Sequence, residues 1–299
     1  MSDLRILLPA LLLPALFSTS CTSDSGHRAT FVQRDSAGVV IVENQEDLPL
    51  DASRWTVAEE PSLSIGAVAG RDDYQFYGIA GGHRFPDGRI AVVNSGSRSV
   101  RIYGEDGTFL QSFGQRGGGP EEFEMPVLAG TRSDTLVIVD RAHHRLSLVH
   151  PDDGFVGLAR ISDDVGGFLN PAGTFANGHS VFGGSFDMRR IGELKNGMNR
   201  AYTFYRSCSP DGSLAADFGD KEGADFFIRD MEGSGQDSRP AVIPFGRLPV
   251  AAVSPSYFFF SPQDDFEIEV YGPSGELVRL IRMVWNPEAV TDEDGIRHI

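Results

Sequence analysis

Two polar residues at the ends of apolar runs are the first candidates for chemistry. Asn94 ends the run IAVVN (90–94), and Asp140 ends the run LVIVD (136–140). A carboxylate or amide that recurs at the ends of equivalent strands could bind a metal ion or a polar ligand if the strand ends lie around a common opening. The other interpretation is a turn-forming residue, with Asp140 bound to backbone amides or to Arg145 across the turn.

Histidine supplies the remaining candidate ligands. The sequence contains seven His, and none shows the H-x-x-x-H or H-x-x-E-H spacing of a zinc site. His83 and His179 lie beside predicted inner strands, so they are the His best placed to act as ligands from separate repeats. If the repeats surround a central channel, a ligand site there would draw on four residues: His83, Asn94, Asp140 and His179. A metal bound at this site would be Zn or Ca. No other cofactor is expected.

Other motifs favour structure over catalysis. The Gly-rich loop GQRGGGPEEF (114–123) lacks the Lys and Ser/Thr of a phosphate-binding loop, and Glu residues follow its glycines. The sequence has no G-x-S-x-G motif, and nothing near Cys208 would activate its thiol. Asp pairs fall in predicted turns, where they are solvated or bind Ca²⁺ weakly; they lie at 72–73, 152–153, 163–164 and 264–265. No catalytic residue is assigned.

The composition excludes several protein classes. Acidic residues number 42 against 26 basic ones, and the net charge is −16. Without a basic tract the chain is not a nucleic-acid-binding protein, because binding to phosphates needs clustered Lys and Arg. The 2 Cys cannot form a disulfide scaffold. The 35 Gly and 17 Pro predict many turns, and hence many short strands.

The N-terminus reads as a targeting segment. Residues 4–17, LRILLPALLLPALF, are too short for a membrane-spanning helix, and their two Pro disfavour one. The small residues before Cys21 resemble the lipobox of bacterial lipoproteins, in which the Cys becomes the lipidated first residue. The alternative is an ordinary secretory signal cut near Ser20. We expect a signal peptide over 1–20, a flexible tether over 21–30, a lipid anchor at Cys21, and a place in the cell envelope on a periplasmic or outer-membrane face.

After the tether, the chain repeats itself. FPDGRIAVVN (85–94) matches TRSDTLVIVD (131–140), and IYGEDGTF (102–109) matches VYGPSGEL (270–277). Asp-Gly or Ser-Gly between two β-rich runs predicts a hairpin. A unit of roughly 45 to 52 residues with about four short strands has the size of a propeller blade.

The repeats predict four units and some additional strands. The units lie at about 74–114, 121–162, 167–219 and 240–284, and the third carries an insertion at 188–200. Three N-terminal segments, VVIVEN (39–44), RWTV (54–57) and SLSIG (62–66), are expected to supply outer strands that complete a final blade. No segment of the mature chain shows a helical period.

FPDGRIAVVN, the D-x-x-x-x-R-L of Asp140 to Leu146, and FGQRGGGPEEFEMP (113–126) resemble the repeats of NHL-type six-bladed β-propellers. The order of a lipoprotein signal followed by these repeats is similar to bacterial six-bladed propeller lipoproteins, whose functions are largely uncharacterised. The resemblance implies an all-β, six-bladed propeller over 31–299. Because only four units and the N-terminal strands are recognisable, either the remaining blades are irregular or the ring is incomplete at its C-terminal end.

Three functions follow as hypotheses. The first is a binding or interaction module in the cell envelope, with a protein or small-molecule ligand, because variable loops on a repeated scaffold present binding surfaces. The second is a metal-dependent lyase or hydrolase at the central channel, since NHL-type lyases bind metal through His from separate blades. The third is a truncated, inactive copy.

Overall fold

The computed structural model describes residues 31–44, 56–167, 169–184, 194–228, 241–284 and 291. The predicted signal peptide, Cys21, the tether and part of the 188–200 insertion lie outside these residues. The regular secondary structure of the described residues consists of β-strands and two short 3-10 helices, η1 (Asp72–Tyr74) and η2 (Asp163–Val165). No helix in this described part is long and apolar enough to cross a membrane.

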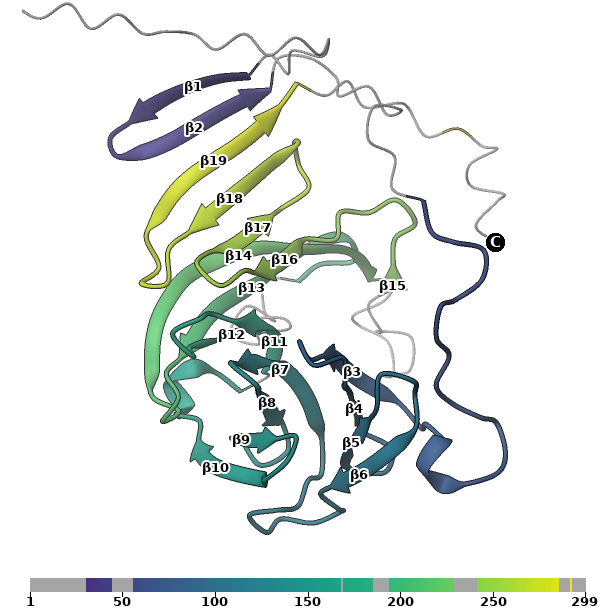
Figure 1. The fold of residues 1–299 in the computed structure, drawn as a ribbon. Coiled ribbons are helices and arrows are strands. Elements are labelled where there is room, and N and C mark those ends of the chain that lie inside the picture. The colour runs from purple at the N-terminus through teal and green to yellow at the C-terminus, as the bar shows by residue number, and fades with distance from the viewer. Residues whose placement is uncertain are drawn as a thin grey trace, which may run out of the picture.

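The strands form four sheets built of antiparallel meanders, here called blades 1 to 4 in chain order (Figure 1). Blade 1 contains β3 (Ile79–Arg84), β4 (Ile90–Asn94), β5 (Ser99–Tyr103) and β6 (Phe109–Phe113). Blade 2 contains β7 (Pro126–Arg132), β8 (Thr135–Asp140), β9 (Arg145–His150) and β10 (Gly154–Arg160). Blade 3 contains β11 (Asn170–Thr174), β12 (Ser180–Gly183), β13 (Gly197–Cys208), β14 (Leu214–Ile228) and β15 (Ala241–Val242). Blade 4 contains β16 (Val250–Val253), β17 (Phe258–Ser261), β18 (Glu267–Tyr271) and β19 (Leu277–Met283). Four units are thus confirmed as four sheets, but the predicted boundary between the third and fourth is wrong, because β14 extends to Ile228 and β15 pairs with it in blade 3.

The N-terminal strands were predicted with mixed success. VVIVEN is confirmed as β2 (Val39–Asn44), which pairs with β1 (Phe31–Ser36) and adds to blade 4 in parallel to β19. The prediction for SLSIG is wrong, because residues 62–66 form no strand. This segment lies on blade 1 instead, where Leu63 and Ile65 meet the turn at Gly107. Residues 56 and 57 of RWTV are likewise not in a strand, and 54–55 lie outside the described residues.

The blades pack face to face through three apolar clusters. Blades 1 and 2 share a cluster that includes Val93, Ile102 and Ile138, all almost fully buried. A second cluster joins blades 2 and 3, and a third joins blades 3 and 4 through aromatic side chains such as Phe218 and Phe258, whose ring centroids are 4.7 Å apart. Alternate side chains of one strand therefore serve two neighbouring interfaces, as expected for strands covered on both faces.

The first strands of the blades form the inner edge of this arrangement. β3 contacts β7, β7 contacts β11, and β11 contacts β16. Each of these three contacts involves a glycine with positive φ, next to a β-bulge. These glycines are Gly81, Gly130 and Gly173. An added Cβ at Gly130 would lie 2.6 Å from Thr174 Oγ1, and one at Gly173 would lie 2.6 Å from Val253 Cβ. These contacts join residues at similar distances from the strand starts, so the inner strands run parallel and nearly in register.

Antiparallel meanders packed face to face around parallel inner strands are the blades of a β-propeller. The chain is thus an all-β protein of the propeller type, as predicted. The described residues contain four blades, and the six blades implied by the family resemblance stay a prediction.

We expect Gly130→Ala to lower the free energy of unfolding by about 1–3 kcal/mol, because the new methyl group meets β11 and the φ of +152° strains an L residue. Urea unfolding measures the change. Gly167→Ala is the control, since nothing lies within 4 Å of its added Cβ; equal destabilisation by both substitutions would contradict the proposed role of Gly130.

Candidate functional site

The two ends of the blades carry different loops. The turns between the second and third strands, at 95–98, 141–144 and 262–266, share one end with the crossovers 114–125 and 161–169 that lead to the next blade. We call this end the crossover face. The opposite end carries the hairpin turns at 85–89 and 175–179, and we call it the hairpin face.

Asp140 lies fully buried at the crossover face. Its carboxylate accepts hydrogen bonds from the backbone amides of Met125 (2.9 Å) and Glu124 (3.2 Å). His143 Nδ1 lies 2.7 Å from Asp140 Oδ2, and Arg145 donates to the same oxygen at 3.4 Å. This carboxylate therefore fixes the end of the crossover from blade 1 just before β7 begins.

The pKa of Asp140 is lowered below its ordinary value. Burial alone would raise it, but the hydrogen bond from His143 and those from the amides of Met125 and Glu124 outweigh burial. The site thus stabilises an ionised carboxylate, and its hydrogen-bonding capacity is already occupied by protein groups.

Asn94 has the corresponding role in blade 1. Its Oδ1 accepts from the Tyr77 amide (3.0 Å), and its Nδ2 donates to the Gln75 carbonyl (3.4 Å). The buried Arg101 reinforces the same segment by donating to the Gln75 carbonyl at 2.8 Å. In blade 4, Gln263 Oε1 accepts from the Leu248 amide in a comparable way. Side-chain anchoring of the segment before an inner strand is a recurring device.

The two His ligand candidates lie elsewhere. His83 is on β3 opposite Ala91, toward the hairpin face, and packs edge-on against Phe85 with ring centroids 4.9 Å apart. Burial lowers its pKa, and the charge of Asp134 offsets only part of this. His179 is in a hairpin-face turn, and its Nδ1 is buried with no hydrogen-bond partner among the described residues.

The structure therefore does not bring the four predicted ligands together. Asn94 and Asp140 are at the crossover face of two different blades, whereas His83 and His179 lie toward the hairpin face. Across the described ranges, no three His, Cys, Asp or Glu side chains are grouped so that they could hold a metal ion.

His143 is the polar residue of this region that the sequence interpretation missed. Asp140 binds its Nδ1, so Nε2 is the nitrogen left for other contacts, and an added Cβ at Gly118 would lie 3.3 Å from that nitrogen. A carboxylate that orients a partly exposed imidazole (35% exposed) is a common arrangement in proton-transfer sites. The D-x-x-H spacing of Asp140 and His143 is the signal that could have indicated it.

The remaining motifs are architectural. The Gly-rich loop is the crossover from β6 to β7, and the Gly119 amide donates to Glu122 Oε2 at 2.8 Å. Asp152 pairs with Arg89, and Asp264 pairs with Arg200, each at 2.7–2.8 Å. Cys208 is buried, and burial raises the pKa of its thiol to about 12. These groups hold the blades together.

Exposed apolar side chains surround the starts of the inner strands at the crossover face. They are 46–63% exposed, and we call them the mouth patch: Tyr77, Ile79, Met125 and Leu248. Each lies within two residues of the first residue of β3, β7 or β16. Since the inner strands run parallel and nearly in register, these side chains gather at one end of the inner edge. Clustered exposed apolar side chains are typical of interaction sites.

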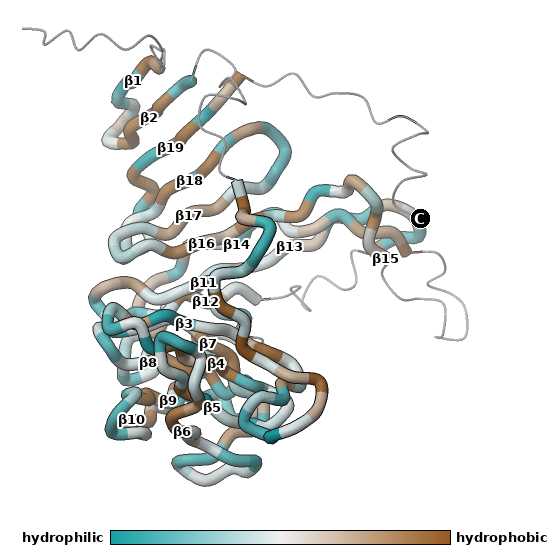
Figure 2. Tube along the Cα trace, turned by 45° about the vertical axis from the view of Figure 1, so that its right-hand side comes forward, coloured by the Kyte–Doolittle hydropathy of each residue, from teal (hydrophilic) through white to brown (hydrophobic). Residues whose placement is uncertain are grey.

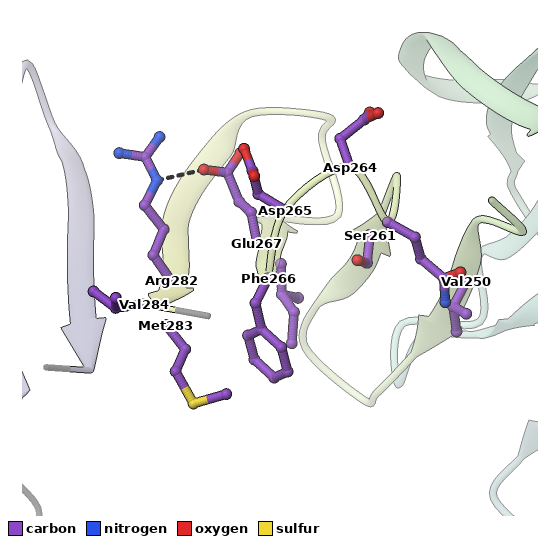
Figure 3. A pocket seen from close by; sticks show the side chains of 11 residues that line it. Val250, Ser261, Asp264, Asp265, Phe266, Glu267, Arg282, Met283 and Val284 are labelled. Atoms are coloured by element: carbon purple, nitrogen blue, oxygen red, sulfur yellow. Dashed lines mark hydrogen bonds and ion pairs between the residues drawn. The ribbon is translucent and has the colours of Figure 1, made fainter. Parts of the chain in front are cut away.

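A cavity of about 890 Å³ opens beside this region, at the end of blade 4. Its apolar lining includes Val250, Phe266 and Met283, and its polar lining includes Glu267 and Arg282 (Figure 3). Figure 3 shows the Phe266 ring and Met283 on one side, with the Glu267–Arg282 ion pair on the other. A volume of this size is within the range of ligand pockets.

No family model matches the chain, and no curated protein matches it. Solved structures with similar shape include a Bacteroides fragilis protein described as exported, with 13% identity and a TM-score of 0.46; the alignment covers 81% of this chain and 60% of that protein. Virginiamycin B lyase from Staphylococcus aureus has 13% identity and a TM-score of 0.34, with 70% and 71% covered. Regucalcin from Agrobacterium tumefaciens has 12% identity and a TM-score of 0.32, with 71% and 76% covered. This chain spans 60% of the length of the Bacteroides protein.

We expect Asp140→Asn to lower the free energy of unfolding by about 2–4 kcal/mol at pH 7, because buried amides and Arg145 lose their charged acceptor. The folded-state pKa of Asp140 is lowered, so its contribution is complete above the unfolded-state pKa near 4. It is lost as the pH falls from there through the folded-state pKa.

Urea unfolding from pH 7 to pH 3 tests this, and the difference between wild type and variant should shrink at the acid end. The exposed Asp134 in the same blade gives the control, Asp134→Asn, which we expect to change stability by less than about 0.5 kcal/mol. A pH-independent difference would contradict the role of the Asp140 charge.

Proposed function

We propose that this chain is an exported binding module of the cell envelope, anchored by a lipid on Cys21, with the mouth patch as its binding surface. The observation that carries the proposal is the exposure of Tyr77, Ile79 and Met125 at the starts of the inner strands. Leaving such side chains in water is unfavourable unless a partner covers them, since burial of each contributes roughly 1.5–3 kcal/mol.

The use of the polar groups at the crossover face supports binding over catalysis. The carboxylate of Asp140 and the amide of Asn94 are occupied by backbone and side-chain partners. A ligand at the mouth would therefore meet apolar side chains with a polar rim, which suits an apolar segment of another protein or a small apolar molecule.

We expect the Cys21→Ala substitution in the full-length gene to move the protein from the membrane fraction to the soluble envelope fraction. The reason is that a diacyl anchor holds a protein on a membrane through many buried methylene groups. Cell fractionation with immunoblotting measures this, and Cys208→Ala is the control because that thiol is buried. An unchanged membrane fraction would rule out lipidation at Cys21.

A photo-crosslinking amino acid at Ile79 should give a discrete adduct in intact cells. The same amino acid at Leu110, on the outer strand of the same blade, is the control, since the two residues are 61% and 49% exposed. We expect the Ile79 adduct to be lost in a Tyr77→Ser/Met125→Ser background, because that change removes the neighbouring apolar contacts. Equal adducts at both positions would overturn the mouth patch as the binding surface.

The two other hypotheses predict different results. A metal-dependent enzyme should carry stoichiometric zinc or calcium when purified without chelator, and a metal content of this kind would redirect attention to His143, His83 and His179. An inactive copy should give no specific adduct at Ile79.

A further inference from the structure

The six-stranded sheet of blade 4 has two faces of different character. One face packs on blade 3 through Phe258, Phe260 and Tyr271. Farther out, the same face carries two ion pairs, Glu267–Arg282 between β18 and β19 and Arg34–Glu43 between β1 and β2. Alternation along the paired strands places the opposite set on the other face, here called the free face: Val40, Val42, Val250, Phe259, Ile268, Ile281 and Met283.

The free face is apolar and, apart from the buried Val270 at its centre, incompletely covered. Val250 is 54% exposed, and most of the other members are half-buried. The cavity at the end of blade 4 is lined by Val250, Ile268 and Met283 of this face and by Glu267 and Arg282 of the other, so it lies at the end of the sheet and reaches the free face there. Figure 2 shows β18, β19, β2 and β1 projecting beyond the other three blades, so these strands extend past their neighbours.

The corresponding outward face of blade 1 shows how the chain covers such a surface. There the segment 62–77 lies on the sheet, and the rings of Tyr74 and Phe76 lie 5.9 and 6.1 Å from that of the fully buried Tyr103. The Tyr103 hydroxyl donates to the Asp73 carbonyl at 2.5 Å, which fixes the segment in place. An apolar sheet face in this protein is thus stable when a layer covers it.

A further blade of the same kind is a poor fit for the free face. In blades 1 to 3 a bulge glycine lets the next inner strand approach, whereas β16 pairs with β17 without a bulge. Ala252 stands where the Ala-Gly-Thr of blade 3 has Gly173. The added strands β2 and β1 also make this sheet wider than the other blades. A wide sheet without a close-approach glycine suits packing of two sheets about 10 Å apart.

The charges at the two ends of the free face are complementary. Arg279 is exposed on this face near the hairpin end, and Asp265 is exposed at the rim of the cavity at the other end. Neither side chain has an ion pair or hydrogen-bond partner among the described residues. A two-fold axis that lies between the two sheets, parallel to them and perpendicular to their strands, would bring Arg279 of one copy toward Asp265 of the other.

We propose that the free face binds the free face of a second copy of this chain, forming a symmetric dimer of two packed sheets. Such an interface is self-complementary, as a two-fold contact requires. Six strands about 4.8 Å apart and roughly 17 Å long offer roughly 400 Å² of flat sheet per copy. The total of about 800 Å² is below the range of stable interfaces, so the dimer should be weak and should dissociate on dilution.

Two full-length copies with different epitope tags, co-expressed and extracted in mild detergent, test the proposal. Capture of one tag after formaldehyde crosslinking in intact cells should recover the other, and separately expressing cells that are mixed before crosslinking should not give this result. Val250→Glu in both copies should lower recovery about tenfold or more, because it places a charge in an apolar interface. Val156→Glu is the matched control, since Val156 on β10 is 50% exposed and belongs to blade 2.

Charge reversal distinguishes this arrangement from any other cover of the free face. Arg279→Glu and Asp265→Arg should each lower recovery severalfold, and the double variant should restore it. Both residues are exposed, so the variants should fold, which circular dichroism checks. No recovery of the second tag in the wild type, or single and double reversals with equal effects, would overturn the proposal. A crosslinked partner at Ile79 would be unaffected by these variants, so the two proposals fail separately.

Discussion

The close approach of successive inner strands is the constraint on which this structure depends. At Gly130 and Gly173 a side chain would overlap the next inner strand, so the blades can meet at the inner edge only where the Cβ is missing. From this edge the sheets diverge, and larger side chains such as Phe218 and Phe258 fill the space between them. Dense packing at the inner edge and between the diverging sheets then fixes the angle between blades, because protein interiors tolerate neither overlap nor voids.

Anchoring of the crossovers is the second requirement, and it explains most of the conspicuous polar residues. A chain leaving the outer strand of one blade must return to the inner edge before the next blade begins. Asp140 and Arg145 bind an amide and a carbonyl of the crossover into blade 2, and Asn94 and Arg101 bind the segment that leads into blade 1 in the same way. Buried charges are stable only when they are paired, so the charged groups of this set serve the structure. What remains for recognition at this face is the exposed apolar mouth patch and the partly exposed imidazole of His143.

The ends of the blade series show where sequence patterns mislead. SLSIG alternates apolar and polar residues as a strand does, but Leu63 and Ile65 need only one apolar surface to lie on, and blade 1 provides it without strand pairing. VVIVEN is a continuous apolar run followed by Glu43, and it does pair, since the free edge of β19 is available to it. A period of two specifies which side chains share a face, and it leaves open whether the backbone finds a hydrogen-bonding partner.

The sequence by itself determined the all-β class, the four units with their hairpins, the acidic charge, and the alternatives for Asp140. These depend on local chemistry: glycine at turns, alternation along strands, and the spacing of repeats. Only the tertiary structure decided that Asn94 and Asp140 lie at one end of the blades while His83 and His179 lie toward the other. It also decided that Asp140 is saturated by Met125, Glu124 and His143, and that blade 4 presents an apolar free face. The physical reason is that burial and hydrogen-bond partners depend on which sheets pack together, and these contacts join residues that no local pattern connects.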